Sequence, residues 1–188
     1  VAGTDEITGR GLVPGGYVLY VSRLEPENNA HIAIEAYASS GITLPLVVVG
    51  GAAYGSTYES SLHEAAGDGV VFCGFVFGEG YRQLQSHASV YLQCTEVGGT
   101  HPALIEAMAY GNAVVALDTR EHREVLGGAG RYYSAVDELA AILRELADDI
   151  AGRERWGNLA ASRAAEMFSW EAVTDAYEAA FHAAASRE

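Results

Sequence analysis

Residues 17–21, Tyr-Val-Leu-Tyr-Val, form an unbroken apolar run near the start of the chain. Such a run, without polar alternation, indicates a strand that is buried on both faces, as in a parallel sheet covered by helices. A helix is expected next, at about 27–38, because Ala30, Ala33 and Ile34 recur at the spacing of one helical face. The opening of the chain therefore predicts an α/β fold.

Strands and helices alternate along the rest of the chain in the same way. Further strands are expected at 44–49, 70–73, 88–92, 113–117 and 131–133, and helices near 60–66, 80–87, 102–110, 121, 135–149, 152–167 and 170–185. Six strands separated by helices predict a Rossmann-like three-layer α/β/α domain around a six-stranded parallel sheet. This domain is expected to span residues 17–188, while the glycine-rich residues 1–16 are expected to be a linker remnant or loop.

The length, the net charge and the absence of lysine exclude several classes of protein. The chain has 188 residues and a mass of 19.8 kDa, the size of one domain or of one half of a two-lobed enzyme. It carries 25 acidic against 11 basic residues, a net charge of −14, which argues against a nucleic-acid partner or an anionic membrane surface. Lysine is absent from the sequence, which excludes a Walker A motif and a Schiff-base lysine.

The sequence also bears on location. No apolar run approaches the ~20 residues that span a bilayer, no signal peptide is visible, and the first residue is not Met. We therefore expect a piece of a longer cytoplasmic protein without a transmembrane segment.

The scattered cysteine and histidine side chains form no convincing catalytic set. Cys73 and Cys94 lack CxxC spacing and adjoin apolar runs, so core packing in a reducing compartment is expected. Residues 121–124, Glu-His-Arg-Glu, offer one histidine without a second ligand nearby, so a solvated helix start is expected there rather than a metal site. No Gly-x-Gly-x-x-Gly motif follows the first strand, which disfavours a dinucleotide oxidoreductase.

The strongest candidate site is residues 98–111, Gly-Gly-Thr-His-Pro-Ala-Leu-Ile-Glu-Ala-Met-Ala-Tyr-Gly. Two glycines permit a sharp turn and a close ligand approach, and Pro102 suits the first position of a helix. The unpaired N–H groups that follow form a seat for an anion such as a phosphate, and Glu106 is placed to accept hydrogen bonds from sugar hydroxyls. A plain glycine-rich turn with a solvated Glu106 fits the spacing equally well.

A second candidate site is residues 21–29, Val-Ser-Arg-Leu-Glu-Pro-Glu-Asn-Asn. Arg23 comes directly after a buried strand, at the edge of the sheet where ligands bind, and its guanidinium can form two hydrogen bonds to a diphosphate. The alternative is that Arg23 pairs with Glu25 or Glu27 on the surface.

Five segments, in this order, resemble the carboxyl-terminal, donor-binding half of retaining GT-B glycosyltransferases of the family-four, group-one type. They are the strand and Ser-Arg-Leu-x-Pro-Glu start within 17–36, the strand and glycines at 44–51, the strand and Gly-Phe-Val at 70–76, the Pro-x-x-x-Glu-Ala-Met-Ala-x-Gly signature within 98–111, and the closing Ser-Trp helix after 168. The resemblance covers nearly the whole chain from about residue 16. It implies that the chain is one lobe of a GT-B fold. The enzyme would transfer a sugar from a nucleoside diphosphate sugar to a glycan or lipid-linked acceptor.

The chain departs from the family pattern at two positions. The first Glu of the family's E-x7-E motif falls on Gly98, so Glu96, two residues earlier, would have to replace it, and the family's diphosphate-binding Lys falls on Asn28. With these two changes, the sequence resembles a rhamnosyltransferase-like subgroup of the family. Enzymes of this subgroup typically build bacterial surface polysaccharides from dTDP-rhamnose. The resemblance further implies no metal or cofactor, a missing N-terminal acceptor lobe, an inactive isolated chain, and a full-length enzyme peripheral to the inner membrane face.

The resemblance also implies a role for each matching residue. The diphosphate would contact Arg23 and Asn28 and the backbone of Thr100, His101, Ala103 and Leu104. Glu106 would bind the ribose, and Phe75 and Val76 would offer backbone groups to the base. The donor sugar would face Glu96, Gly98 and Gly99. Arg23 and Glu96 would be the catalytic residues. Two other interpretations stay open: one lobe of a nucleotide-sugar 2-epimerase, and a GT-B-like lobe retained as a non-catalytic interaction module.

Overall fold

The computed structural model describes residues 2–52 and 56–185 of the chain. Six parallel strands form one sheet in the order β3-β2-β1-β4-β5-β6. The strands are β1 (Val18–Val21), β2 (Leu46–Val49), β3 (Val70–Gly74), β4 (Val90–Gln93), β5 (Ala113–Leu117) and β6 (Arg131–Tyr133). The expectation of a six-stranded parallel Rossmann-like sheet is confirmed, with strand ends shifted by at most two residues.

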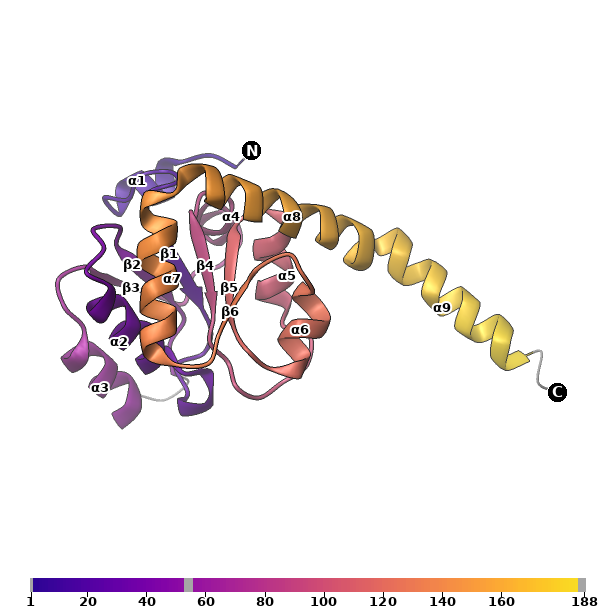
Figure 1. Ribbon diagram of the computed structural model, residues 1–188, viewed down its shortest axis with the longest axis horizontal. Helices are drawn as coiled ribbons and strands as arrows, with labels where there is room; N and C mark the ends of the chain where they lie inside the picture. Colours follow the sequence, from indigo (N-terminus) through magenta and orange to yellow (C-terminus); the bar gives the residue numbers. More distant parts are fainter. Residues whose placement is uncertain (1, 53–55, 186–188) are drawn as a thin grey trace.

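Helices cover both faces of this sheet (Figure 1). The helices are α1 (Asp5–Gly9), η1 (Pro26–Asn28), α2 (Ala30–Ser40), α3 (Thr57–Ala65), α4 (Gly78–Ser86), α5 (Pro102–Ala109), α6 (Arg120–Leu126), α7 (Val136–Asp148), α8 (Ile150–Phe168) and α9 (Trp170–Ala185). Residues of α2, α3 and α7 pack into one hydrophobic core, and residues of α1, α4, α5, α6 and α8 pack into the other.

The strands supply alternate side chains to the two cores. Tyr20 of β1 and Leu92 of β4 face the core of α2 and α7, while Leu19 and Tyr91 face the core of α5 and α8. This alternation follows from the period of two in a strand. Because both faces are buried, these strands read as continuous apolar runs, which is the pattern that the sequence shows.

The N-terminal segment differs from the sequence prediction. The prediction of a loop or linker over residues 1–16 is wrong for α1, because Ile7 in this short helix and Leu12 after it are both buried in the core. Gln83 of α4 accepts a hydrogen bond from the amide of Glu6 at 2.9 Å and donates one to Asp5 at 2.8 Å. The segment therefore packs as part of the folded domain.

The first helix of the domain also differs from its prediction. Instead of one helix at 27–38, the chain forms η1, a left-handed residue at Asn29 with φ of 57°, and then α2. This break lets the Asn29 side-chain amide donate to the carbonyl of Cys94 at 3.0 Å, which ties the start of α2 to the end of β4. Cys94 is buried, as expected, whereas Cys73 is only partly buried at the edge of the core.

The last helix, α9, extends away from the body of the domain (Figure 1). None of its residues is buried, and Trp170, Tyr177 and Phe181 are strongly exposed. Within the described ranges, no helix combines the length and the apolar character needed to cross a bilayer.

Candidate functional site

A cavity of about 390 Å³ opens at the carboxyl edge of the sheet, where β1 lies beside β4. From β1, the chain continues to β2 and β3 toward one edge of the sheet, and then returns to β4 on the other side of β1 and continues to β5 and β6. This point of reversal is where open α/β sheets bind ligands. The walls come from the ends of β1, β2 and β4, the loop between β3 and α4, and the first residues of α5.

Gly50, after β2, lets the floor of this cavity form. Its backbone has φ of +131°, and a Cβ atom there would lie 1.8 Å from the carbonyl oxygen of Ser22. Only glycine allows the ends of β1 and β2 to approach this closely. The approach keeps Ser22 and Arg23 at the cavity wall.

Arg23 lines the cavity, and its side chain is exposed. Among the described residues its guanidinium forms no ion pair and no hydrogen bond, so the alternative pairing with Glu25 or Glu27 is wrong. Its five N–H donors are thus directed to solvent and available to an anionic ligand.

Asn28 makes its side-chain contact within the protein. It is buried and lines none of the cavities at this edge, and its side-chain amide donates to the carbonyl of Arg23 at 2.9 Å. The Tyr20 hydroxyl donates to the Asn28 carbonyl at 2.7 Å. In this structure Asn28 therefore holds the loop that carries Arg23, and its direct contact with a diphosphate stays a prediction.

The start of α5 offers fewer free amides than expected. Pro102 has no N–H, and the amide of Leu104 donates to the carbonyl of His101 at 3.0 Å, while the Leu104 side chain is buried in the core. The amides of His101 and Ala103 donate to none of the residues that the structure describes, and both residues line the cavity. The anion seat at this helix end therefore consists of these two amides.

The His101 ring lies between Gly98 and His122. A Cβ atom at Gly98, whose φ is +141°, would lie 2.7 Å from a carbon of that ring, and the ring centroids of His101 and His122 are 5.3 Å apart. Burial and the neighbouring His122 together lower the pKa of His101. Gly98, which was expected to face the donor sugar, here provides space for this ring.

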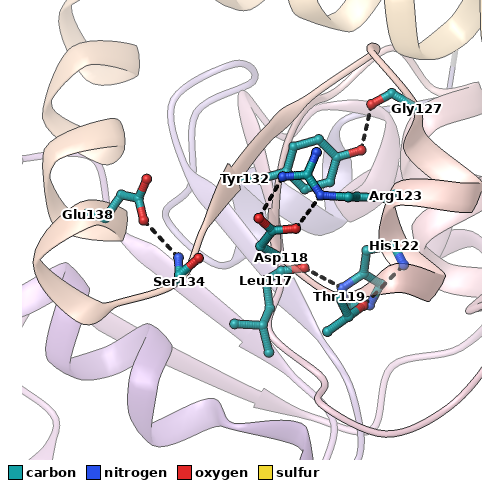
Figure 2. A network of polar contacts seen from close by, with 9 residues as sticks. All are labelled: Leu117, Asp118, Thr119, His122, Arg123, Gly127, Tyr132, Ser134 and Glu138. Carbon is teal, nitrogen blue, oxygen red and sulfur yellow. Dashed lines mark hydrogen bonds and ion pairs between the residues drawn. The ribbon is translucent and has the colours of Figure 1, made fainter.

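His122 is buried, so the expected solvated helix start at 121–124 is wrong at this residue. Figure 2 shows its ring held by the carbonyl of Leu117 at 2.8 Å, and its amide donating to the hydroxyl of Thr119 at 3.1 Å. Burial lowers the pKa of His122, although the Leu117 contact opposes this shift.

Arg123, on the same helix, pairs with Asp118 at 2.6 Å and lies 4.6 Å above the ring of Tyr132 (Figure 2). These contacts of Arg123 therefore hold the loop between β5 and α6 in place. Within the described ranges, no group of three His, Cys, Asp or Glu side chains could hold a metal ion.

Aromatic rings form the opposite wall of the cavity. Phe75 and Phe77 are more than half exposed, and their rings are parallel within 5° with centroids 6.2 Å apart. Val76 between them also lines the cavity. Parallel exposed rings beside a cavity provide a flat apolar surface on which another planar group can stack.

Tyr81 of α4 connects this aromatic wall to α5. Tyr81 lines the cavity, and its hydroxyl donates a hydrogen bond to Glu106 Oε2. Glu106 is exposed and lies beside the cavity rather than in its lining. Gln85 donates to the Tyr81 hydroxyl at 2.9 Å from the other side.

Seven of the expected residues do not line the main cavity: Asn28, Glu96, Gly98, Gly99, Thr100, Leu104 and Glu106. Glu96 is exposed and lines a separate cavity of about 280 Å³ with Asn29. Gly99 and Thr100 line a smaller one of about 190 Å³. The structure thus brings together Arg23, Phe75, Val76, His101 and Ala103 in one cavity.

The roles of Phe77, Tyr81 and Gln85 and the burial of His122 were not predicted from the sequence. Phe77 follows directly on the Gly-Phe-Val segment, so its position after the third strand was a usable signal. Tyr81 and Gln85 stand four residues apart, which places them on one face of a helix. Their contacts with α5 could not be inferred from that spacing.

Comparison with known proteins finds a family whose sequence model this chain matches. The sequence model described as "Glycosyl transferases group 1" matches residues 15–149. O-antigen chain mannosyltransferase B of Escherichia coli is 29% identical over 174 residues, an alignment covering 85% of this chain and 44% of that protein. The chain thus spans less than half the length of this relative.

Solved structures show the same fold. HepE of Anabaena, crystallised in complex with UDP, superposes with a TM-score of 0.84 at 23% identity, covering 97% of this chain and 52% of that one. Sucrose-phosphate synthase of Thermosynechococcus elongatus superposes with a TM-score of 0.81 at 18% identity, covering 100% of this chain and 50% of that one. The fold is therefore that of a GT-B glycosyltransferase lobe.

Proposed function

Because the chain belongs to the group 1 glycosyl transferases, we propose that it is the donor-binding lobe of a retaining glycosyltransferase. The complete enzyme would transfer a sugar from a nucleoside diphosphate sugar to a glycan or lipid-linked acceptor in polysaccharide synthesis. A second, acceptor-binding lobe would supply the other half, and the enzyme would work in the cytoplasm at the inner membrane face.

One observation carries this proposal: an unpaired guanidinium and free helix amides share a cavity with exposed aromatic rings. A nucleoside diphosphate has matching parts, a planar base at one end and two phosphates at the other. The base would stack beside Phe75 and Phe77, and the diphosphate would bind Arg23 and the amides of His101 and Ala103. The ribose, which joins the two, would lie near Tyr81 and Glu106.

Arg23 and the start of α5 would also perform the catalytic work. During transfer, the bond between the anomeric carbon and the phosphate oxygen breaks, and the acceptor oxygen bonds to that carbon on the same face. The acceptor's proton leaves with the diphosphate, which gains negative charge as the bond breaks. Preorganised donors beside the diphosphate stabilise this charge in the transition state.

The donor sugar would extend beyond the diphosphate toward Gly98, Gly99 and Glu96. The exposed carboxylate of Glu96 is free to accept sugar hydroxyls there, in the place of the family's first Glu. The rhamnosyltransferase-like motifs support dTDP-rhamnose as the donor, whereas the name of the Escherichia coli relative supports a mannosyl donor. A diphosphate seat binds either, because it contacts neither base nor sugar.

Binding of nucleotides to this chain tests the proposal. We expect dTDP, UDP or GDP to bind at millimolar concentration in calorimetry or in an NMR titration, and we expect the chain alone to transfer no sugar. Uridine and thymidine, which lack the diphosphate, are the matched controls and should bind more weakly. Failure of all three diphosphates to bind at millimolar concentration would remove the proposal.

A further inference from the structure

The main cavity, of about 390 Å³, has a single charged side chain, Arg23, among the described residues that line it. The other polar side chains of the lining belong to Ser22, Tyr81, Gln93, Thr95 and His101. A nucleoside diphosphate sugar carries two negative charges, one on each phosphate. The Arg23 guanidinium balances one of them. Of the remaining side chains, the imidazole of His101 is the one that can become a cation near neutral pH.

His101 occupies the N-cap position of α5, directly before the first helical turn. Side chains at this position lie beside the first helix amides and commonly accept a hydrogen bond from them. The His101 side chain makes no such bond, and its ring nitrogens have no hydrogen-bond partner in the described part of the chain. The imidazole and the free amides of His101 and Ala103 are therefore at the same end of the helix, where the proposed function seats the diphosphate.

His122 lies against the His101 ring without adding a charge. The two ring centroids are 5.3 Å apart. His122 Nδ1 lies 2.8 Å from the carbonyl oxygen of Leu117, which can only accept, so Nδ1 carries a proton. Burial lowers the pKa of His122, so the ring is neutral at pH 7 and its Nε2 is unprotonated. A positive charge on His101 therefore meets no like charge from this neighbour.

The protein alone keeps His101 neutral at pH 7, because burial, and secondly His122, lower the pKa of its imidazole. The other titratable side chains on the surrounding elements are Arg23 after β1, Tyr81 of α4, Glu96 in the loop before α5, Glu106 of α5 and Glu121 of α6. None of these five contributes to the shift of the His101 pKa. A diphosphate beside the ring reverses the shift, because an opposite charge within about 4–6 Å favours the protonated imidazole.

We propose that the imidazole of His101 binds the diphosphate as a second cation beside Arg23, and that a nucleotide sugar therefore binds together with one proton. This inference rests on the proposed function, which places the diphosphate at the start of α5. The proton comes from the solvent and stays on the imidazole while the nucleotide sugar is bound. Binding is then tighter at lower pH, because the complex holds more protons than its two free partners.

Nucleotide sugars are the probes for this test. Each of their two phosphates keeps one negative charge between pH 6 and pH 8, so the ligand takes up no proton itself. UDP is unsuitable here, because its terminal phosphate titrates at about pH 6. The chain is titrated with UDP-glucose, dTDP-rhamnose and GDP-mannose, and the one that binds most tightly is used.

Calorimetry at pH 6.5, in two buffers that differ in ionisation enthalpy, measures the number of protons taken up on binding. We expect uptake of about half a proton or more per nucleotide sugar. By linkage, uptake of about half a proton per pH unit makes the affinity about tenfold higher at pH 6 than at pH 8. A purely structural role for His101 predicts equal heats in both buffers.

His101→Gln removes the titratable group and keeps the backbone amide of the anion seat. We expect this variant to take up no proton, and its affinity to change by less than about twofold between pH 6 and pH 8. His31→Gln is the matched control, because His31 is an exposed histidine that does not line the cavity. It should keep the proton uptake of the unmodified chain.

A second measurement needs no variant. The Cε1–H signal of His101, assigned through the backbone, reports the pKa of the imidazole in an NMR pH titration. In the unmodified chain we expect a saturating nucleotide sugar to raise this pKa by about one pH unit or more.

Equal heats in the two buffers, a His101 pKa that the nucleotide sugar does not raise, or proton uptake that persists in His101→Gln would overturn this inference and leave the proposed function intact. Failure of all three nucleotide sugars to bind also overturns it. If dTDP, UDP and GDP do not bind either, the proposed function itself fails.

Discussion

Arg23 is the residue whose environment bears most directly on anion binding. The chain carries a net charge of −14, which opposes the approach of a diphosphate. At physiological salt, however, charges more than about 8 Å away are largely screened, while a hydrogen bond to a charged group contributes about 1.5–3 kcal/mol. The nearby guanidinium, which has no described partner of its own, therefore outweighs the distant acidic surface.

We predict that Arg23→Ala weakens the binding of a nucleoside diphosphate by about 1.5–3 kcal/mol, because it removes a charged hydrogen-bond donor. Calorimetric titration of both proteins with UDP or dTDP measures the change. Arg155→Ala, which removes an exposed guanidinium on α8 that does not line the cavity, is the control and should leave binding unchanged. Equal affinity of Arg23→Ala and the unmodified chain would exclude Arg23 from the site.

His122 leads to a prediction about pH. Burial lowers the pKa of His122 below its ordinary value of 6.5, so the folded state holds fewer protons than the unfolded chain at mildly acidic pH. The contribution to stability is complete above pH 6.5 and is lost as pH falls from there toward the lower folded pKa. We expect His122→Asn, whose amide can still donate to Leu117, to show a smaller decrease of Tm between pH 7 and pH 5. A decrease of the same size in both proteins would contradict this assignment, and His31→Asn, at an exposed histidine, is the control.

At the level of elements, the ends of β1 and β2 depend on one glycine. We predict that Gly50→Ala destabilises the protein by more than about 2 kcal/mol, because the added Cβ would meet the Ser22 carbonyl at 1.8 Å and alanine is strained at φ of +131°. Urea unfolding measures the loss. Gly67→Ala, which has open space around it and no positive φ, should change stability by less than about 0.5 kcal/mol. A similar small effect at Gly50 would mean that the two strand ends can separate without cost.

The elements themselves were largely predictable, and each of the two exceptions has a physical cause. Segments with a clear apolar run or helical period, such as 113–117 and 170–185, have the predicted bounds, because the pattern along the chain is enough to determine them. α1 was missed because it has only five residues and one buried side chain, Ile7, so no periodic signal exists. The break at Asn29 was missed because its cause is a contact with Cys94, a residue distant in sequence.

At the scale of the whole molecule, the two ends of the chain contribute unequally to the domain. Ile7 and Leu12 are buried, whereas α9 has no buried residue. We predict that removal of residues 1–12 costs about 3–6 kcal/mol of unfolding free energy, the value of two buried aliphatic side chains. Removal of the residues after Ser169 should cost less than about 1 kcal/mol. Urea denaturation of the two shortened chains makes the comparison, and a larger loss from the second truncation would contradict the observed packing.

The alternation of apolar runs and helical periods predicted the sheet, its parallel strands and the edge where the cavity opens, because these follow from patterns within a few residues. The same local reasoning singled out Arg23 and the turn before α5 as parts of a site. Three contacts became visible only in the folded chain: Asn28 supports a loop, Tyr81 contacts Glu106, and His101 lies against His122. These contacts join residues that are 5 to 25 positions apart in the sequence, so their formation depends on how helices and loops pack rather than on any period in the sequence.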